Sequence, residues 1–261
     1  MEFTEKVVLI SGATGGMGAE IANQLSSKGA KLALFARRED KLAEISSKLG
    51  KNCDCVYQKC DVKNQDDVVR AVEFTNNSFG KIDCAILTAG VLVPNPIQRF
   101  DSKIIKDSME INFMGNVYFI EQLLHIMKKQ KSGTIAATST LPDRRGVPGW
   151  GAYGASKAAL SWLLESLRSE AKQRYNIDVI TIKPGSVLTP MLEDYKRRGA
   201  ITPEKAASLI IDGIMKGKKI IQFPFSQVAL VRMTDAFPVN AYDNFDIDQQ
   251  KGEGYPSVDE E

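Results

Sequence analysis

Residues 6–20, KVVLISGATGGMGAE, decide the fold of this chain. An apolar run over 6–11 leads through a glycine-rich segment into a helical pattern over 16–28. A turn from strand to helix leaves backbone N–H groups and the positive end of the helix dipole facing one point, which suits a pyrophosphate. Gly12, Gly16 and Gly18 would let the backbone approach such a group closely and adopt positive φ. The stretch therefore predicts a βαβ unit that holds a dinucleotide.

The same alternation of apolar runs and helical patterns continues along the chain. The expected strands are 6–11, 31–36, 53–62, 82–90, 133–140, 176–185 and 218–223, and the expected helices are 16–28, 39–49, 64–79, 101–130, 150–175 and 203–216. This order predicts an α/β fold, a single-domain Rossmann-type doubly wound parallel sheet of about seven strands with helices on both faces. We expect this domain to span 1–242. Residues 243–261 hold seven acidic residues and one lysine, which predicts an acidic tail that is mobile or lies on a partner.

Composition narrows the function classes. The chain has 34 basic and 32 acidic residues, so we expect no nucleic-acid partner. No apolar run approaches the ~20 residues of a membrane span, and residues 1–11 lack the pattern of a secretory signal. With His125 as the single histidine, neither a Ser-His-Asp triad nor a His-based metal site is expected, and we predict no metal. The four cysteines need no disulfide framework, Cys53 and Cys55 are expected to be buried inert thiols, and a cytoplasmic location follows.

The second informative stretch is YGASKAAL, residues 153–160. Tyr153 and Lys157 lie one helical turn apart, so their side chains share a helix face. A free tyrosine has a pKa near 10, and a neighbouring ammonium group favours the phenolate and lowers that pKa. Tyr153 could then exchange a proton with a carbonyl or alcohol oxygen. Alone, the pair would suit an ordinary surface helix, but the glycine-rich turn upstream favours catalysis.

The spacing of the first glycines is G-x-x-x-G-x-G, which, with Y-x-x-x-K downstream, resembles the shorter-chain subfamily of the short-chain dehydrogenase/reductase family. The resemblance covers residues 5 to about 223. Its further markers occur in family order: CDV at 60–62, LTAG at 87–90, Asn112, the span from Ser139 to Tyr153, and PGSVLT at 184–189. The resemblance implies an oxidoreductase that interconverts a carbonyl and a secondary alcohol with a nicotinamide cofactor.

The resemblance also implies catalytic roles. Tyr153 would be the acid/base, Lys157 would also hold the nicotinamide ribose, and Asn112 would complete a proton relay through water. The substrate oxygen would be held by Thr140 or Ser139. The family's serine usually lies 13 residues before the tyrosine, where this chain has Thr140, and strand alternation sends Ser139 to the opposite face. We therefore prefer Thr140 and keep Ser139 as the alternative.

The end of the second expected strand indicates the cofactor. An acidic residue there would bind the ribose 2′-hydroxyl of NAD, but this chain has Ala36-Arg37-Arg38. Two guanidinium groups could pair with a 2′-phosphate, and Thr14 could add a hydroxyl, so we predict NADP(H). The alternative is that Arg37 and Arg38 only flank a solvated turn. The family's other basic position is occupied by Gly15.

Further cofactor contacts follow from the resemblance. Asp61 and Val62 would lie against adenine, although Asp61 could equally be a loop acid that starts the next helix. Thr88-Ala89-Gly90 replaces the family's Asn-Ala-Gly and would cover the adenosine side. The segment 184–189 would pass the nicotinamide. The expected cofactor-binding residues are Gly12, Thr14, Gly15, Gly16, Met17, Gly18, Arg37, Arg38, Asp61, Val62, Ala89, Gly90, Tyr153, Lys157, Pro184, Gly185, Val187 and Thr189.

The substrate and the partners are less defined. Arg144 and Arg145 lie in a loop that borders the substrate in the family, and solvated loop charges are preferred over an anion-binding role. Residues 186–204 are expected to form a short substrate lid over a small-molecule carbonyl or alcohol. The helices over 101–130 and 150–175 are apolar on several sides, which predicts a homodimer or homotetramer. The alternatives are a redox sensor or regulatory dimer with little turnover, or NAD-dependent alcohol oxidation.

Overall fold

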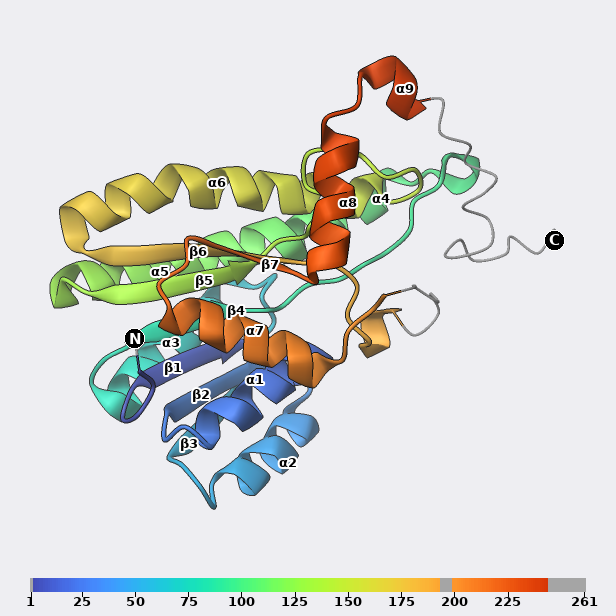
Figure 1. The fold of residues 1–261 in the computed structure, drawn as a ribbon. Coiled ribbons are helices and arrows are strands. Elements are labelled where there is room, and N and C mark those ends of the chain that lie inside the picture. Colours follow the sequence, from blue (N-terminus) through green and yellow to red (C-terminus); the bar gives the residue numbers. More distant parts are fainter. Residues whose placement is uncertain (1, 193–198, 244–261) are drawn as a thin grey trace.

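The computed structural model describes residues 2–192 and 199–243. Seven parallel strands form one sheet in the order β3-β2-β1-β4-β5-β6-β7 (Figure 1). The strands are β1 Val7–Ser11, β2 Lys31–Ala36, β3 Cys55–Lys59, β4 Cys84–Leu87, β5 Gly133–Thr138, β6 Ile177–Pro184 and β7 Ile220–Phe223. The predicted Rossmann-type parallel sheet is confirmed. Its order reverses between β1 and β4, which is where ligands bind in open sheets of this kind.

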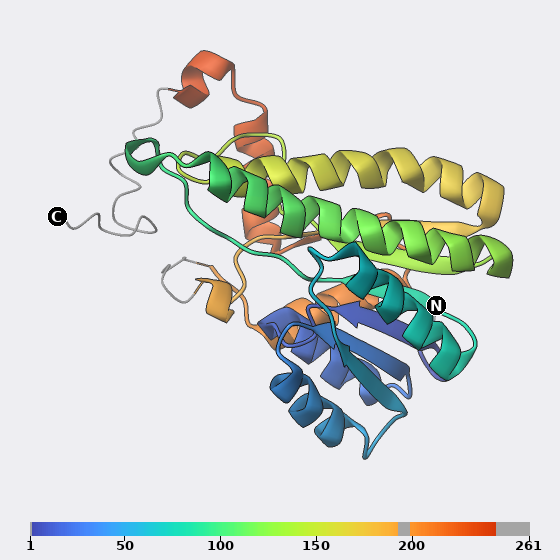
Figure 2. The ribbon, with the colours of Figure 1, turned by 180° about the vertical axis from the view of Figure 1, so that it is seen from behind.

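Helices cover both faces of the sheet. The helices are α1 Gly16–Ser26, α2 Glu39–Leu49, α3 Gln65–Phe79, α4 Ser102–Met109, α5 Gly115–Gln130, α6 Gly151–Tyr175, α7 Pro203–Met215, α8 Phe225–Asp235 and α9 Val239–Asp243, with short turns η1 Ile97–Arg99, η2 Glu110–Met114 and η3 Pro190–Leu192. One face of the sheet is covered by α1, α2 and α7. The opposite face, seen in Figure 2, is covered by α3, α5 and α6. Among the described residues, no helix is long and apolar enough to cross a bilayer.

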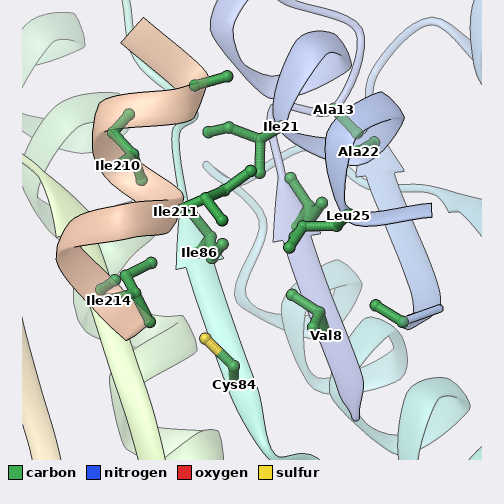
Figure 3. Close-up of a cluster of buried hydrophobic side chains, with 14 of the residues drawn as sticks. Val8, Ala13, Ile21, Ala22, Leu25, Cys84, Ile86, Ile210, Ile211 and Ile214 are labelled. Atoms are coloured by element: carbon green, nitrogen blue, oxygen red, sulfur yellow. The ribbon is translucent and has the colours of Figure 1, made fainter. Parts of the chain in front are cut away.

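Strand alternation divides the core into two layers. In β1, Val8 and Ile10 face α1 and α7, whereas Leu9 faces the other side. Figure 3 shows the first layer, in which Ile21 and Leu25 of α1 meet isoleucines of α7 above Val8. Fully burying each such side chain contributes about 1.5–3 kcal/mol. The two apolar layers fix the sheet and leave the carboxyl ends of its strands for the site.

Four elements differ from the sequence expectation. The single helix expected over 101–130 is interrupted by the π-helical turn Glu110–Met114. The strand expected over 53–62 is shorter, because the Cys53 backbone N–H bonds the Leu49 carbonyl in the turn that leaves α2. Cys53 and Cys55 are both half-buried rather than buried, and burial raises the pKa of the Cys53 thiol to about 11. The sequence analysis did not foresee α8 and α9. The expected tail lies outside the described residues, apart from Asp243 at the end of α9.

Candidate active site

The glycine-rich turn between β1 and α1 is closely packed against neighbouring backbone. Gly12 has a φ of 72°, and a Cβ atom there would lie 2.7 Å from the backbone nitrogen of Ala89. A Cβ atom at Gly18 would lie 2.3 Å from the Gly12 carbonyl oxygen, and one at Gly16 would lie 2.7 Å from Thr189 Cγ2. Within the described part of the chain, no side chain caps the N-terminus of α1. Its first amides can therefore serve an anion, and the turn fits a dinucleotide pyrophosphate.

Arg38 lies beside this turn. Its Nη2 atom donates hydrogen bonds to the Thr14 carbonyl oxygen at 2.8 Å and to Thr14 Oγ1 at 3.1 Å. Arg37 is exposed one residue earlier, at the end of β2. The structure thus brings Arg38 and Thr14 together at the glycine-rich turn, and Arg37 lies at its margin.

Lys157 is buried where β4 and β5 end. Only 3% of the residue is exposed, and its ammonium group donates to the Thr138 carbonyl at 2.7 Å. Burial lowers the pKa of Lys157 to about 8. Its Nζ lies 6.0 Å from the centroid of the Tyr153 ring, so the two side chains share one face of α6 as their spacing predicts.

Asn112 reaches the same point from the π-helical turn. A Cβ atom at Gly90 would lie 3.0 Å from Asn112 Oδ1 and 3.3 Å from Lys157 Nζ, so both groups meet there. Asn112 Oδ1 accepts from the Val91 backbone N–H at 2.8 Å, and its Nδ2 donates to the Val91 carbonyl and to Ser156 Oγ, both at 3.0 Å. Both amide protons are therefore in use, and the side chain can serve a water only as an acceptor.

Ser156 is a site residue that the sequence analysis missed. It is a fully buried residue of α6, it faces Asn112, and its hydroxyl donates to the Tyr153 carbonyl at 2.7 Å. It therefore links Asn112 to the turn of helix that presents Tyr153. Its position three residues after Tyr153, one turn along the same helix, was the available signal.

Ser139 and Thr140 lie in different surroundings. Ser139 Oγ bonds the Lys157 carbonyl at 2.9 Å and Ser161 Oγ at 2.7 Å, and the residue is fully buried against α6. The backbone amides of Ser139 and Leu141 both pair with carbonyls of β6, so the intervening Thr140 side chain leaves on the other side of the strand. The two hydroxyls therefore cannot do the same work.

The two residues expected beside adenine, Asp61 and Val62, are held by local contacts. Asp61 Oδ1 accepts from the Lys63 backbone N–H at 3.1 Å, and the Asp61 N–H donates to Asp67 at 2.9 Å, as in an ordinary turn before a helix. Val62 packs against Gly115, where a Cβ atom would lie 2.8 Å from the Val62 side chain. Val62 is thus fixed by α5, and Asp61 serves the turn whether or not it also contacts a ligand.

The segment after β6 lies beside the glycine-rich turn and under α8. Thr189 contacts Gly16, as noted above, and Val187 pairs with Ile201 in an isolated bridge. A Cβ atom at Gly185 would lie 2.1 Å from Gln227 Oε1 of α8. Pro184 closes β6, and its carbonyl accepts the Leu141 N–H at 3.0 Å. Residues 193–198 of the expected lid lie outside the described residues.

The two arginines of the β5–α6 loop differ. Arg144 is exposed, whereas Arg145 donates to the carbonyls of Phe237 and Asp235 beyond and at the end of α8. The preferred interpretation of both as solvated charges is therefore wrong for Arg145. In the same loop, Asp143 forms an ion pair with Lys183 of β6, and both side chains are largely buried. The sequence analysis missed this ion pair and the contact of Arg145 with the end of α8.

Comparison with known proteins defines the class. The family model described as short chain dehydrogenase matches residues 6–199. The chain is 35% identical over 225 residues to an uncharacterized oxidoreductase of Listeria monocytogenes, covering 80% of this chain and 90% of the relative. It is 34% identical to the 11-beta-hydroxysteroid dehydrogenase-like 2 protein of Arabidopsis thaliana, and the match covers 85% of this chain and 74% of that relative. This chain belongs to the short-chain dehydrogenase/reductase family, and it is an oxidoreductase of that family.

Solved structures agree on the fold. A short chain dehydrogenase/reductase from Burkholderia phymatum in complex with NAD aligns with a TM-score of 0.83 at 22% identity, over 98% of this chain and 99% of that one. One from Burkholderia cenocepacia in complex with NADP aligns with a TM-score of 0.80 at 22% identity, over 90% and 95%. Neighbours of the same fold thus include complexes with each cofactor.

Proposed function

We propose that this protein is an NADP(H)-dependent oxidoreductase that interconverts a small-molecule carbonyl and a secondary alcohol. One observation supports this most strongly. The Lys157 ammonium group and Asn112 Oδ1 meet at Gly90, and Tyr153 lies one turn before Lys157 on the same helix. Four unpaired thiols support a reducing, cytoplasmic setting.

The preference for NADP(H) rests on the end of β2. Arg38 contacts the Thr14 hydroxyl beside the glycine-rich turn, and Arg37 is exposed next to it. A 2′-phosphate placed here would meet guanidinium donors, which pair well with phosphate. Of the described residues at this position, none is a carboxylate that would favour the 2′-hydroxyl of NAD. The first amides of α1 would hold the pyrophosphate.

Each catalytic residue has a separate task in this proposal. The nicotinamide, when bound, supplies or accepts the hydride. During reduction, Tyr153 donates its phenolic proton to the carbonyl oxygen, and Thr140 donates a hydrogen bond to the same oxygen. The Lys157 charge favours the phenolate that remains. Asn112, through its free acceptor capacity, orients a water that returns a proton toward Lys157.

The decisive experiment follows absorbance of NADPH and NADH with a panel of carbonyl compounds. We expect turnover with NADPH at lower cofactor concentration than with NADH. Tyr153→Phe keeps the aromatic ring and removes the proton, so turnover should fall by about 10²–10⁴ while NADPH binding persists. Cofactor binding without turnover on any carbonyl would instead support a redox sensor, and equal use of both cofactors would reject the role of Arg38.

A further inference from the structure

Helix α8 is attached at its first turn to the segment that follows β6. Gln227 Oε1 accepts from the Ser186 backbone N–H at 2.8 Å, and its Nε2 donates to the Gly199 carbonyl at 3.1 Å. The absence of a side chain at Gly185 makes this approach possible. Gln227 therefore holds α8 against Ser186 and Gly199, two described residues of the part of the chain expected to border the nicotinamide and the substrate.

At its other end, α8 is attached to the β5–α6 loop. Arg145 Nη2 donates to the Phe237 carbonyl and, at 3.4 Å, to the Asp235 carbonyl. These carbonyls lie at the negative end of the helix dipole, which favours a cation. The Arg145 guanidinium also lies 5.2 Å from the ring of Tyr242 in α9, and the Tyr242 hydroxyl donates back to the Gly146 carbonyl at 2.8 Å. The contact is therefore reciprocal.

The β5–α6 loop is thus fixed on two sides. The Asp143–Lys183 ion pair ties its first half to β6, and Arg145 ties its middle to α8 and α9. Thr140 lies at the start of this loop, two residues after the end of β5. Figure 1 shows α8 standing at the carboxyl edge of the sheet, beside the ends of β6 and β7. A helix of 11 residues, about 16 Å long, therefore connects the β5–α6 loop to the segment after β6, and we expect a substrate to lie between these two segments.

We propose that α8 sets the separation of these two segments and that Arg145 is a positioning residue for substrate recognition. This inference rests on the proposed function. The charge of Arg145 is satisfied by carbonyls and an aromatic ring, so it acts on the substrate through the loop rather than as an anion receptor. The cofactor phosphates are expected at the glycine-rich turn and Arg38, on elements that Arg145 does not contact. Loosening the loop should therefore weaken substrate binding and spare NADPH binding.

The test compares Arg145→Met with Arg144→Met, which removes the same charge from the exposed neighbouring position. Hydrogen exchange of the cofactor-free protein is measured first. Arg145→Met should speed exchange in both 142–149 and 225–243, and Arg144→Met should change neither. With a carbonyl substrate from the panel, Arg145→Met should raise KM about tenfold, the effect of losing one charge-assisted hydrogen bond. Its kcat should change less, and its dissociation constant for NADPH should stay near that of the wild type.

Two outcomes would overturn the proposal. The first is that the hydrogen-exchange rates and KM of Arg145→Met match those of Arg144→Met. The second is that Arg145→Met weakens NADPH binding and substrate binding equally, which would indicate a general loosening of the structure. If Arg145→Met does not fold, Tyr242→Phe removes one oxygen from the same contact and should speed exchange around Gly146. If the wild type fails to oxidise NADPH with every carbonyl of the panel, the proposed function is contradicted. The hydrogen-exchange comparison still decides whether Arg145 couples the loop to α8.

Discussion

Ser139 and Thr140, which follow β5, carry two adjacent hydroxyls, and substitution of each can show which one donates a hydrogen bond to the substrate oxygen. The Ser139 hydroxyl is bound to α6 on the buried side, and Thr140 leaves the strand on the other side. Thr140→Val keeps the shape and deletes the hydroxyl, so we expect kcat to fall by about 10² or more, as when one donor to a developing oxyanion is lost. NADPH affinity should be unchanged. Steady-state kinetics and cofactor titration measure both.

Ser139→Ala is the matched control. It leaves the Ser161 hydroxyl and the Lys157 carbonyl without this partner, so we expect a loss of about 1–2 kcal/mol in the free energy of unfolding and only a mild change in kcat. A strongly reduced kcat in Ser139→Ala together with a normal kcat in Thr140→Val would show that Ser139, not Thr140, is the donor to the substrate oxygen.

The buried ammonium group of Lys157 makes stability depend on pH. Its pKa is lowered to about 8 in the folded protein, whereas an unfolded lysine titrates near 10.4. Below pH 8 Lys157 is protonated in both the folded and the unfolded protein, so the folded state bears the full free-energy cost of burying its charge. Between these two pKa values only the unfolded chain holds the proton, so this residue's contribution to the free energy of unfolding rises with pH.

Urea unfolding of the cofactor-free protein at pH 7 and pH 9.5 checks this trend, with Lys157→Met as the reference. The wild type should gain stability relative to Lys157→Met at the higher pH, because the substitution removes the titration of Lys157. An unchanged difference between the two proteins at both pH values would show that Lys157 has an ordinary pKa.

At the scale of single elements, the turn between β1 and α1 combines two demands on Gly12. Gly12 and Gly80 both have positive φ, but a side chain at Gly80 would meet nothing within 4 Å, whereas one at Gly12 would collide with the backbone of Ala89. We expect Gly80→Ala to cost about 1–2 kcal/mol from backbone strain alone. Gly12→Ala should cost a further 1–3 kcal/mol or so, because backbone has to move. Equal unfolding midpoints in urea would contradict the close packing of the turn.

The periodicity of the sequence predicts most elements because their packing is regular. Buried parallel strands have continuous apolar runs, and α6 shows Tyr153 and Lys157 at the spacing of one turn. The π-helical turn at Asn112 was not predictable, because one extra residue per turn barely alters an apolar pattern. Helix α8 was missed because Val228 is its single buried residue, and large apolar side chains such as Phe225 and Leu230 are exposed, so the helix lacks an apolar stripe.

For the whole molecule, the exposed side of α6 bears on the predicted oligomer. Leu160 and Leu164 of α6 are buried in the core, but Trp162 is 77% exposed in the single chain. Burying such a side chain against a partner would contribute about 1.5–3 kcal/mol. We expect the wild type to be a dimer or tetramer and Trp162→Glu to shift it toward monomer.

Light scattering after size exclusion gives the mass of each species. Leu230→Glu, at an exposed leucine of α8 outside the predicted interface, should leave the mass unchanged. A wild type that is monomeric at all concentrations, or a Trp162→Glu protein with unchanged mass, would reject this face as the interface.

Local spacing in the sequence identifies candidate site residues but not their tertiary contacts. Tyr153, Lys157 and the glycine-rich turn depend on local spacing, so they were identified before the structure. Arg145 meets backbone atoms about ninety residues away, and such contacts depend on the tertiary arrangement alone. The same reason explains why Gln227 was missed, since it too bonds backbone atoms.

That preference for backbone atoms affects how the protein can diverge. The partners of Arg145 on α8 are carbonyls, and those of Gln227 are an amide and a carbonyl, so most side chains of α8 are free of the attachment. Substitutions along α8 can therefore accumulate and alter the surface offered to the substrate while the helix stays in place. Only Arg145 and Gln227 would need to be conserved to keep α8 in place, and its other residues are free to vary. We therefore expect the substrate range of related proteins to change faster than their fold.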